Sequence, residues 1–120
     1  MLINTPISLG ELVDKISILI IKEKNITDET KLDHVKKELD FLQKTLMNYV
    51  QQEEINNYLE NLININSKLW NIEDDIRECE RKKLFDQTFI DLARSVYFTN
   101  DERAKVKNAV SYTHLRAHET

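Results

Sequence analysis

The stretch LDHVKKELDFLQKTLMNYV, residues 32–50, decides the fold class of this chain. Its apolar residues recur at steps of three or four, the period of one helix face and close to that of a coiled-coil seam. These residues are Leu32, Val35, Leu39, Leu42, Leu46 and Val50. Thr27 or Asp28 stands where an N-cap is expected, and polar residues predict a short connection near 50–54. The stretch therefore predicts an amphipathic helix that packs against other helices.

A second helix is predicted before this stretch, with a well-marked start. Ser8 and Glu11 have the spacing of a capping box, in which each side chain bonds the other residue's backbone amide. Ile7 and Leu12 stand at the two positions of a hydrophobic staple. We expect this helix to run to about Asn25.

The predicted N-terminal helix is apolar on two sides. One face carries Leu9, Leu12, Val13, Ile16, Leu19 and Ile20. Ile18 and Ile21 lie on the opposite side. A helix of this kind is either central in a bundle or shared with a partner, so both a dimer contact and a contact with a fourth helix stay open.

Two more stripes follow residue 50. The first comprises Ile55, Leu59, Leu62, Leu69 and Ile76 and ends near Lys82. The second follows a possible cap at Asp86 and comprises Phe89, Leu92, Ala93, Val96 and Tyr97, after which the helix either continues or restarts at Asn100. The chain has one Gly and one Pro, far too few for folds built from many turns. The sequence predicts an all-α fold: an antiparallel bundle of three long helices plus a shorter C-terminal helix.

Length and composition limit the function classes. A chain of 120 residues is expected to form a single domain, here residues 1–110. The net charge is -4 and no basic face is evident, so we expect no nucleic-acid partner. The longest apolar run, residues 18–21, cannot span a bilayer, and no secretory signal is recognisable, so no membrane association is expected. Cys79 has no partner cysteine, and the expected compartment is the cytoplasm.

The last ten residues, SYTHLRAHET at 111–120, differ in composition from the rest of the chain. They contain no Asn, Ile or Lys, although these residues are frequent before them. We interpret this segment as non-native or disordered, with an ordinary frayed C-terminus as the alternative. Without it His34 is the only histidine, so no Ser-His or Cys-His arrangement and no metal site is expected.

Several polar residues fall on predicted apolar faces. Asn66, Glu73 and Arg77 lie near the middle of the apolar arc of their helix when residues are plotted at 100° each. The candidate ligand-binding residues of such an interior layer are Glu23, Asn66, Glu73, Asp74, Arg77, Asn100 and Arg103. Charged groups inside a bundle must pair or face a wet cavity, which favours a binding site. The alternative is a surface pairing of Arg77 with Glu73 and Asp74, and a register-fixing role for Asn66.

Three segments also carry a family resemblance: PISLGELVDKISILIIK at 6–22, LWNIEDDIR at 69–77 and LARSVYFTNDERAKVK at 92–107. In this order they resemble a family of short bacterial and phage proteins, domain of unknown function 6165, over nearly all of residues 5–110. The resemblance implies a small all-helical protein and brings no known activity. The chain departs from the family pattern at Ile20, where an acid is expected, and at Glu23, where an apolar or variable residue is usual.

Two functions from different classes follow from these patterns. The preferred one is a binding or assembly module, expected to form a homodimer, with a polar interior layer that could also hold a small polar or phosphorylated ligand. The alternative is a Mg²⁺-dependent enzyme acting on a phosphorylated or nucleotide small molecule, suggested by the spacing of Glu11 and Asp14. A remote option is a cation clamp for a dicarboxylate, formed by Arg77 and Arg103. No cofactor is identified.

Overall fold

A computed structural model describes the backbone of residues 1–119 and the side chains of residues 1–112. It contains α1 (Leu9–Asn25), α2 (Glu29–Met47), α3 (Gln52–Lys82) and α4 (Gln87–Glu119). No strand is present among residues 1–119, and the all-α bundle predicted from the sequence is confirmed. No helix in the described part of the chain is both long and apolar enough to cross a membrane.

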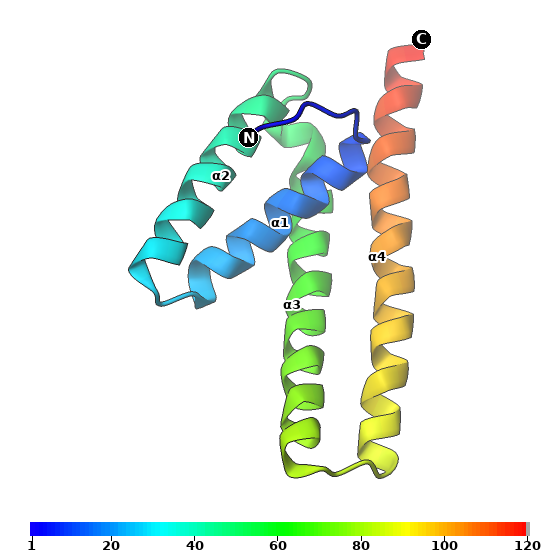
Figure 1. The fold of residues 1–120 in the computed structure, drawn as a ribbon. Helices are drawn as coiled ribbons and strands as arrows, with labels where there is room; N and C mark the ends of the chain where they lie inside the picture. The colour runs from blue at the N-terminus through cyan, green and yellow to red at the C-terminus, as the bar shows by residue number, and fades with distance from the viewer. Residues whose placement is uncertain (120) are drawn as a thin grey trace.

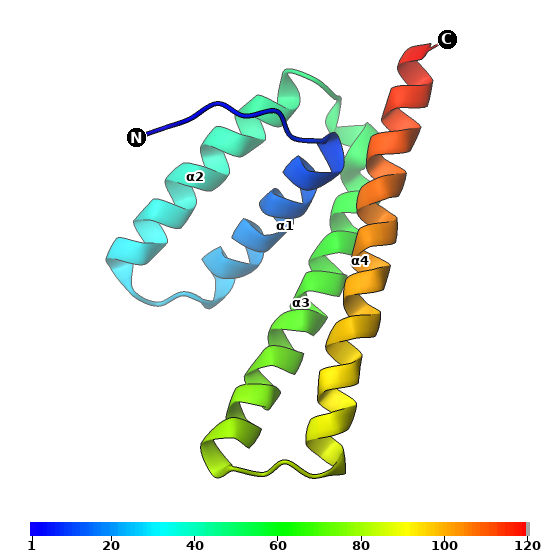
Figure 2. The ribbon, with the colours of Figure 1, turned by 45° about the vertical axis from the view of Figure 1, so that its right-hand side comes forward.

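The helices form two antiparallel hairpins of unequal length. α3 and α4 run side by side as the long hairpin, and the shorter α1–α2 hairpin packs against the half of it that is far from the α3–α4 turn (Figure 1). Figure 2 shows the same arrangement from the side, with the turn end of the α3–α4 hairpin extending beyond α1 and α2. The molecule is accordingly elongated, with extents of 53 × 35 × 26 Å.

The fourth helix is longer than the sequence suggested. We expected the C-terminal helix to be the shortest, but α4 has 33 residues and α3 has 31. The sequence left open whether the helix continues or restarts at Asn100, and α4 continues through that position. In the interior of a helix, Asn is less favourable than Ala by roughly 0.7 kcal/mol at most. The packing of α4 along α3 outweighs this intrinsic preference of Asn100.

Helix ends follow local capping chemistry. The Ser8 side chain accepts a hydrogen bond from the Glu11 amide at 3.1 Å, and Asp28 accepts from the Thr30 and Lys31 amides at 3.0 Å. Asp86 caps α4 through the Thr88 amide at 3.1 Å. α3 ends where Lys83 adopts left-handed backbone angles (φ 54°), which lets the Leu84 amide donate to the Cys79 carbonyl at 2.9 Å. This C-cap turns the chain back into α4.

α1 is the central helix of the bundle. It contacts α2, α3 and α4, and its Val13, Ile16 and Leu19 join the core with Leu39, Leu46, Leu62 and Val110 from the other helices. Ile21, on the second apolar side of α1, is only 5% exposed in the single chain. Of the two alternatives left open by the sequence, contact with further helices of the same chain accounts for this side of α1.

The start of α1 lies directly against the backbone of α4. A Cβ atom added to Gly10 would stand 2.1 Å from the Lys107 carbonyl oxygen and 2.8 Å from the Ser111 hydroxyl oxygen. The Gly10 amide uses this closeness to donate to the Ser111 hydroxyl at 2.8 Å. The only glycine of the chain is therefore required by helix–helix distance, since any side chain would force α1 away from α4.

Candidate functional site

Four polar side chains from three helices meet inside the bundle and are here named the Asp14 centre: Asp14 and Ser17 of α1, Asn66 of α3 and Arg103 of α4. The Asp14 side chain is 2% exposed. Arg103 donates two hydrogen bonds to its carboxylate, from Nε to Oδ1 at 2.9 Å and from Nη2 to Oδ2 at 2.5 Å. The centre thus joins α1 to both helices of the long hairpin.

The remaining bonds of the Asp14 centre complete a closed network. Asn66 Nδ2 donates to Asp14 Oδ1 at 3.0 Å and to the Ser17 hydroxyl at 2.8 Å. Ser17 in turn donates to the Asp14 backbone carbonyl at 2.6 Å. No buried side-chain nitrogen or oxygen among the described side chains lacks a hydrogen-bond partner. A buried network of this kind stabilises one arrangement of the helices, because each group has replaced its water with a protein partner.

Electrostatics keep the Asp14–Arg103 pair charged. Burial acts to raise the pKa of Asp14, but hydrogen bonds from Arg103 and Asn66 and the charges of Arg103 and Lys107 outweigh it, so the pKa lies below its ordinary 3.8. The hydrogen bond to Asp14 raises the pKa of Arg103 against the effect of burial, with further help from the charges of Asp14, Glu11 and Glu73. At neutral pH the centre is an ion pair.

A second ion pair lies close to the Asp14 centre. Lys107 of α4 contacts Glu11 of α1 with a Nζ–Oε1 distance of 2.5 Å. The Glu11 carboxylate is thus held by α4, and the only capping-box bond between Ser8 and Glu11 that is observed is the one from the Glu11 amide. Together the two ion pairs and the Gly10 contact attach the N-terminal half of α1 to α4.

The seven residues predicted as an interior layer divide into two groups. Asn66 and Arg103 belong to the Asp14 centre. Glu23, Glu73, Asp74, Arg77 and Asn100 are exposed. Their expected inward placement was wrong, and no described contact brings all seven together. Their role in ligand binding stays a prediction.

The exposed position of Glu73 and Arg77 has a geometric cause. Both lie on the same face of α3 as Asn66, the face that α1 covers where it crosses, but α1 crosses only the upper part of α3 (Figure 1). Beyond that crossing the same face is open to water, and the Arg77 side chain is 67% exposed. There Arg77 contacts Asp74 at 2.9 Å and Glu73 at 3.7 Å, the surface pairing that the sequence left as an alternative.

Asn100 and Glu23 are exposed for other reasons. Thr99, one position earlier in α4, is 1% exposed and points into the bundle. The buried face of α4 is therefore rotated about the helix axis relative to the face predicted from Phe89 and Val96. The same rotation leaves Tyr97, which was expected on the apolar side, 69% exposed. Glu23 is in the last turn of α1, past the crossing.

Asp14 and Ser17 were not predicted as members of the interior layer, and Asp14 was expected only as one of the two acids of a possible Mg²⁺ site. Neither residue lies on the face of α1 that the large apolar residues define. A second stripe with steps of four, three and four joins Gly10, Asp14, Ser17 and Ile21, all of them buried. Small residues along one helix face signal close approach of another helix, and an acid among them signals a buried partner. This pattern was available in the sequence.

Potential metal ligands do not gather in the described part of the chain. Among residues 1–112, no three His, Cys, Asp or Glu side chains lie together in a way that could hold a metal ion. Glu11, one of the two acids behind the Mg²⁺ alternative, is paired with Lys107, and Asp14 is paired with Arg103.

The outer face of α4 presents a different candidate surface. Ile90, Tyr97 and Phe98 are exposed there although they are apolar or aromatic. The Arg94 guanidinium lies 5.9 Å from the centre of the Phe98 ring, and the Tyr97 and Phe98 rings meet edge to face with centroids 6.0 Å apart. At the hairpin turn Leu84 and Phe85 are also exposed.

In a comparison with protein-family models the chain matches a family of unknown function (DUF6165) over residues 3–116. The chain belongs to this family. The DUF6165 match includes all four members of the Asp14 centre and the outer face of α4. The curated proteins and the solved structures contain no match to the chain.

The DUF6165 match also bears on the end of the chain. It extends through residue 116, inside the segment 111–120, and Ser111 accepts the Gly10 hydrogen bond. Residue 120 and the side chains of 113–119 lie outside the described part of the structure. The non-native or disordered character of this segment, and the domain limit at residue 110, stay predictions.

Proposed function

We propose that this protein is an assembly module that forms a homodimer through the outer face of α4. The observation that carries the proposal is a stripe of exposed apolar, aromatic and charged side chains on a helix whose opposite face packs in the core. Ile90, Arg94, Tyr97 and Asp101 follow each other at steps of four, three and four residues, so they form one line along α4. Phe98 lies beside this line.

The composition of this stripe suits a protein partner. Tyr, Phe and Arg are enriched at interfaces: the aromatic rings bury a large apolar area with few rotatable bonds, and Tyr and Arg carry a polar end that can hydrogen-bond. Tyr97 and Phe98 are 69% and 55% exposed, while Arg94 is already positioned over Phe98. The stripe carries both charge signs, which favours a protein surface over the phosphate backbone of a nucleic acid.

Charge complementarity favours a second copy of this chain in the antiparallel orientation. Consider a two-fold axis that crosses α4 between Tyr97 and Phe98. Arg94 lies three residues before Tyr97 and Asp101 three residues after Phe98, so the axis sets Arg94 of each copy opposite Asp101 of the other. The aromatic side chains of both copies then meet at the centre.

Other pairings of the same face fit less well. In a parallel arrangement Arg94 would oppose Arg94 and Asp101 would oppose Asp101, which is unfavourable. Within one chain the two residues are separated by about 10 Å along the helix axis, so they do not satisfy each other. Antiparallel pairing is the arrangement that neutralises both charges.

In this proposal the Asp14 centre has a structural role. Its Asp14 carboxylate is bound by Arg103 and Asn66, and it fixes α1 to the hairpin whose outer face carries the interface. We propose the cytoplasm as the working compartment, since Cys79 forms no disulfide.

Sedimentation velocity across a concentration series tests the proposal. We expect the wild-type protein to sediment as a dimer and the double variant Tyr97→Ser/Phe98→Ser as a folded monomer. Phe41→Ser is the matched control, because Phe41 is 63% exposed but belongs to α2. A monomeric wild type at about 100 µM, or a double variant that still dimerises, would contradict the proposal.

A further inference from the structure

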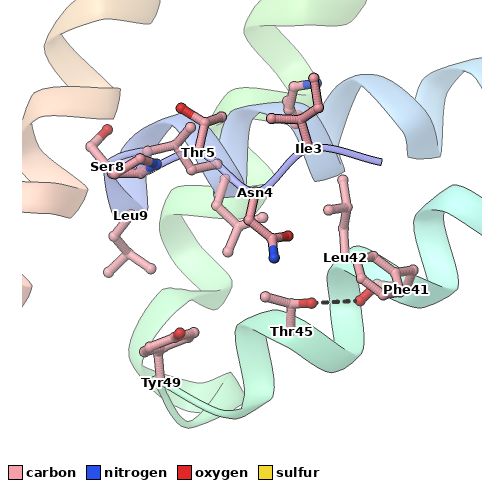
Figure 3. A pocket seen from close by; sticks show the side chains of 13 residues that line it. Ile3, Asn4, Thr5, Ser8, Leu9, Phe41, Leu42, Thr45 and Tyr49 are labelled. Carbon is pink, nitrogen blue, oxygen red and sulfur yellow. Dashed lines mark hydrogen bonds between the residues drawn. The ribbon is translucent and has the colours of Figure 1, made fainter. Parts of the chain in front are cut away.

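A groove on the other hairpin is independent of the α4 surface. It has a volume of about 700 Å³ and lies between the N-terminal segment, the first half of α1 and the C-terminal half of α2. Figure 3 shows the segment from Ile3 to Ser8 passing over α2, with the groove between them. The groove is separate from the Asp14 centre, which is formed by α1, α3 and α4.

The walls of the groove are mostly apolar. Leu9 and Leu42 are half-buried, whereas Phe41 of α2 and Tyr49, in the turn that follows α2, are largely exposed. Two large aromatic side chains left in water beside a concave apolar surface are typical of a ligand site, and the volume falls in the range of about 300–1,000 Å³ seen for small-molecule sites.

Charge identifies the kind of ligand. Among the residues whose side chains the structure describes, Lys15 is the only Lys, Arg, Asp or Glu that lines the groove. Glu11, one turn earlier on α1, is held by Lys107 of α4, and Lys15 makes no ion pair within the described part of the chain. The groove therefore combines apolar walls with one unpaired positive charge.

A neutral donor supplements this charge. In Figure 3 the Asn4 side chain points from the N-terminal segment into the groove. The nearby Thr45 hydroxyl donates to the Phe41 carbonyl at 2.9 Å, so its proton is already used. Lys15 and Asn4 are therefore available as donors for a ligand, together with the hydroxyl groups of Thr5, Ser8 and Tyr49 that also line the groove.

We propose that this groove binds the carboxylate form of a medium-chain fatty acid. The alkyl chain lies along Leu9, Phe41 and Leu42, and the carboxylate is bound by the Lys15 ammonium. Each methylene group moved from water into the groove should tighten binding about fourfold. The charge contact, at an exposed amine, should add about fivefold and weaken with salt.

Titration with decanoate, followed by amide and methyl NMR shifts of the full chain, tests this proposal. We expect the shifts to be confined to residues 3–15 and 41–49, and octanoate to bind about 16-fold more weakly than decanoate. Decanol should bind about fivefold more weakly, and decylamine more weakly still. Lys15→Met should remove the preference for decanoate over decanol, whereas Lys24→Met, on the same helix but outside the groove, should keep it.

A second pair of variants separates the groove from general surface adsorption. Phe41→Ser should weaken decanoate binding, while Met47→Ser, which changes an exposed apolar residue of α2 that does not line the groove, should leave it unchanged. Equal affinity for decanoate and decanol, shifts outside these segments, or binding to anionic vesicles without binding of free decanoate would each overturn the proposal. These measurements do not depend on whether the protein is a dimer.

Discussion

Replacing Arg103 by Met tests the Asp14 centre most sharply. The substitution keeps much of the side-chain volume but removes two of the three donors that Asp14 receives from other residues, leaving only Asn66. The Asp14 carboxylate, 2% exposed, would then be an uncompensated buried charge. Breaking a buried pair in this way costs about 3–5 kcal/mol. The free energy of unfolding of a domain of this size is about 5–15 kcal/mol, so the substitution would remove a large part of its stability.

Urea unfolding measures this loss. With a denaturant slope of about 1–3 kcal/mol per molar, the midpoint of Arg103→Met should fall by about 2 M. The measurement belongs in the Tyr97→Ser/Phe98→Ser background, so that dimer dissociation does not contribute. Arg77→Met is the matched control, because Arg77 is 67% exposed and its surface pairs contribute less than about 1 kcal/mol.

A double-mutant cycle separates the ion pair from general damage to packing. Asp14→Asn should cost less than Arg103→Met, about 1–3 kcal/mol, since the Arg103 side chain is 27% exposed and can reach water. Combining both changes should give a coupling energy of about 2 kcal/mol. An Arg103→Met variant no less stable than Arg77→Met would refute the reasoning.

Three further predictions concern the same packing. Because the folded-state pKa of Asp14 lies below 3.8, the ion pair contributes fully to stability above about pH 5, and this contribution is lost as the pH falls through the lowered pKa. The free energy of unfolding, measured as a function of pH, should therefore fall more steeply in acid for the wild type than for Asp14→Asn. Gly10→Ala should destabilise by about 1–3 kcal/mol in thermal unfolding, despite the better helix propensity of Ala, because its Cβ would meet the Lys107 carbonyl; an unchanged midpoint would count against that contact. Lys83→Gly should stabilise by about 0.5–1 kcal/mol, since glycine adopts φ 54° without strain, and a lower midpoint would contradict the cap assignment.

The features that the sequence predicted well are local ones. Ser8 and Asp86 cap their helices where they were expected, and Asp28 is the cap of the two candidates Thr27 and Asp28, because a cap depends only on residues within one turn. The stripe around Leu39 and Leu46 was equally readable, since a helix that buries one face must show its period.

The site was only partly predictable, because it depends on how far one helix covers another. A plot at 100° per residue places Asn66, Glu73 and Arg77 on one face, but it does not tell where along that face α1 stops. Asp14 was not placed in the interior layer for a related reason: it lies on the second face of α1, where small residues rather than large apolar ones mark the close contact with α4.

Sedimentation of two charge-reversal variants, alone and mixed, is the most direct test of assembly through α4. Arg94→Asp and Asp101→Arg should each be monomeric alone, because every contact across the two-fold axis then joins like charges. Mixed in equal amounts they should form a dimer, since the two acids on the stripe of one variant then face the two arginines on the stripe of the other. Glu102→Arg, off the stripe, should dimerise like wild type. A mixture that stays monomeric beside a dimeric wild type would contradict the antiparallel α4 interface.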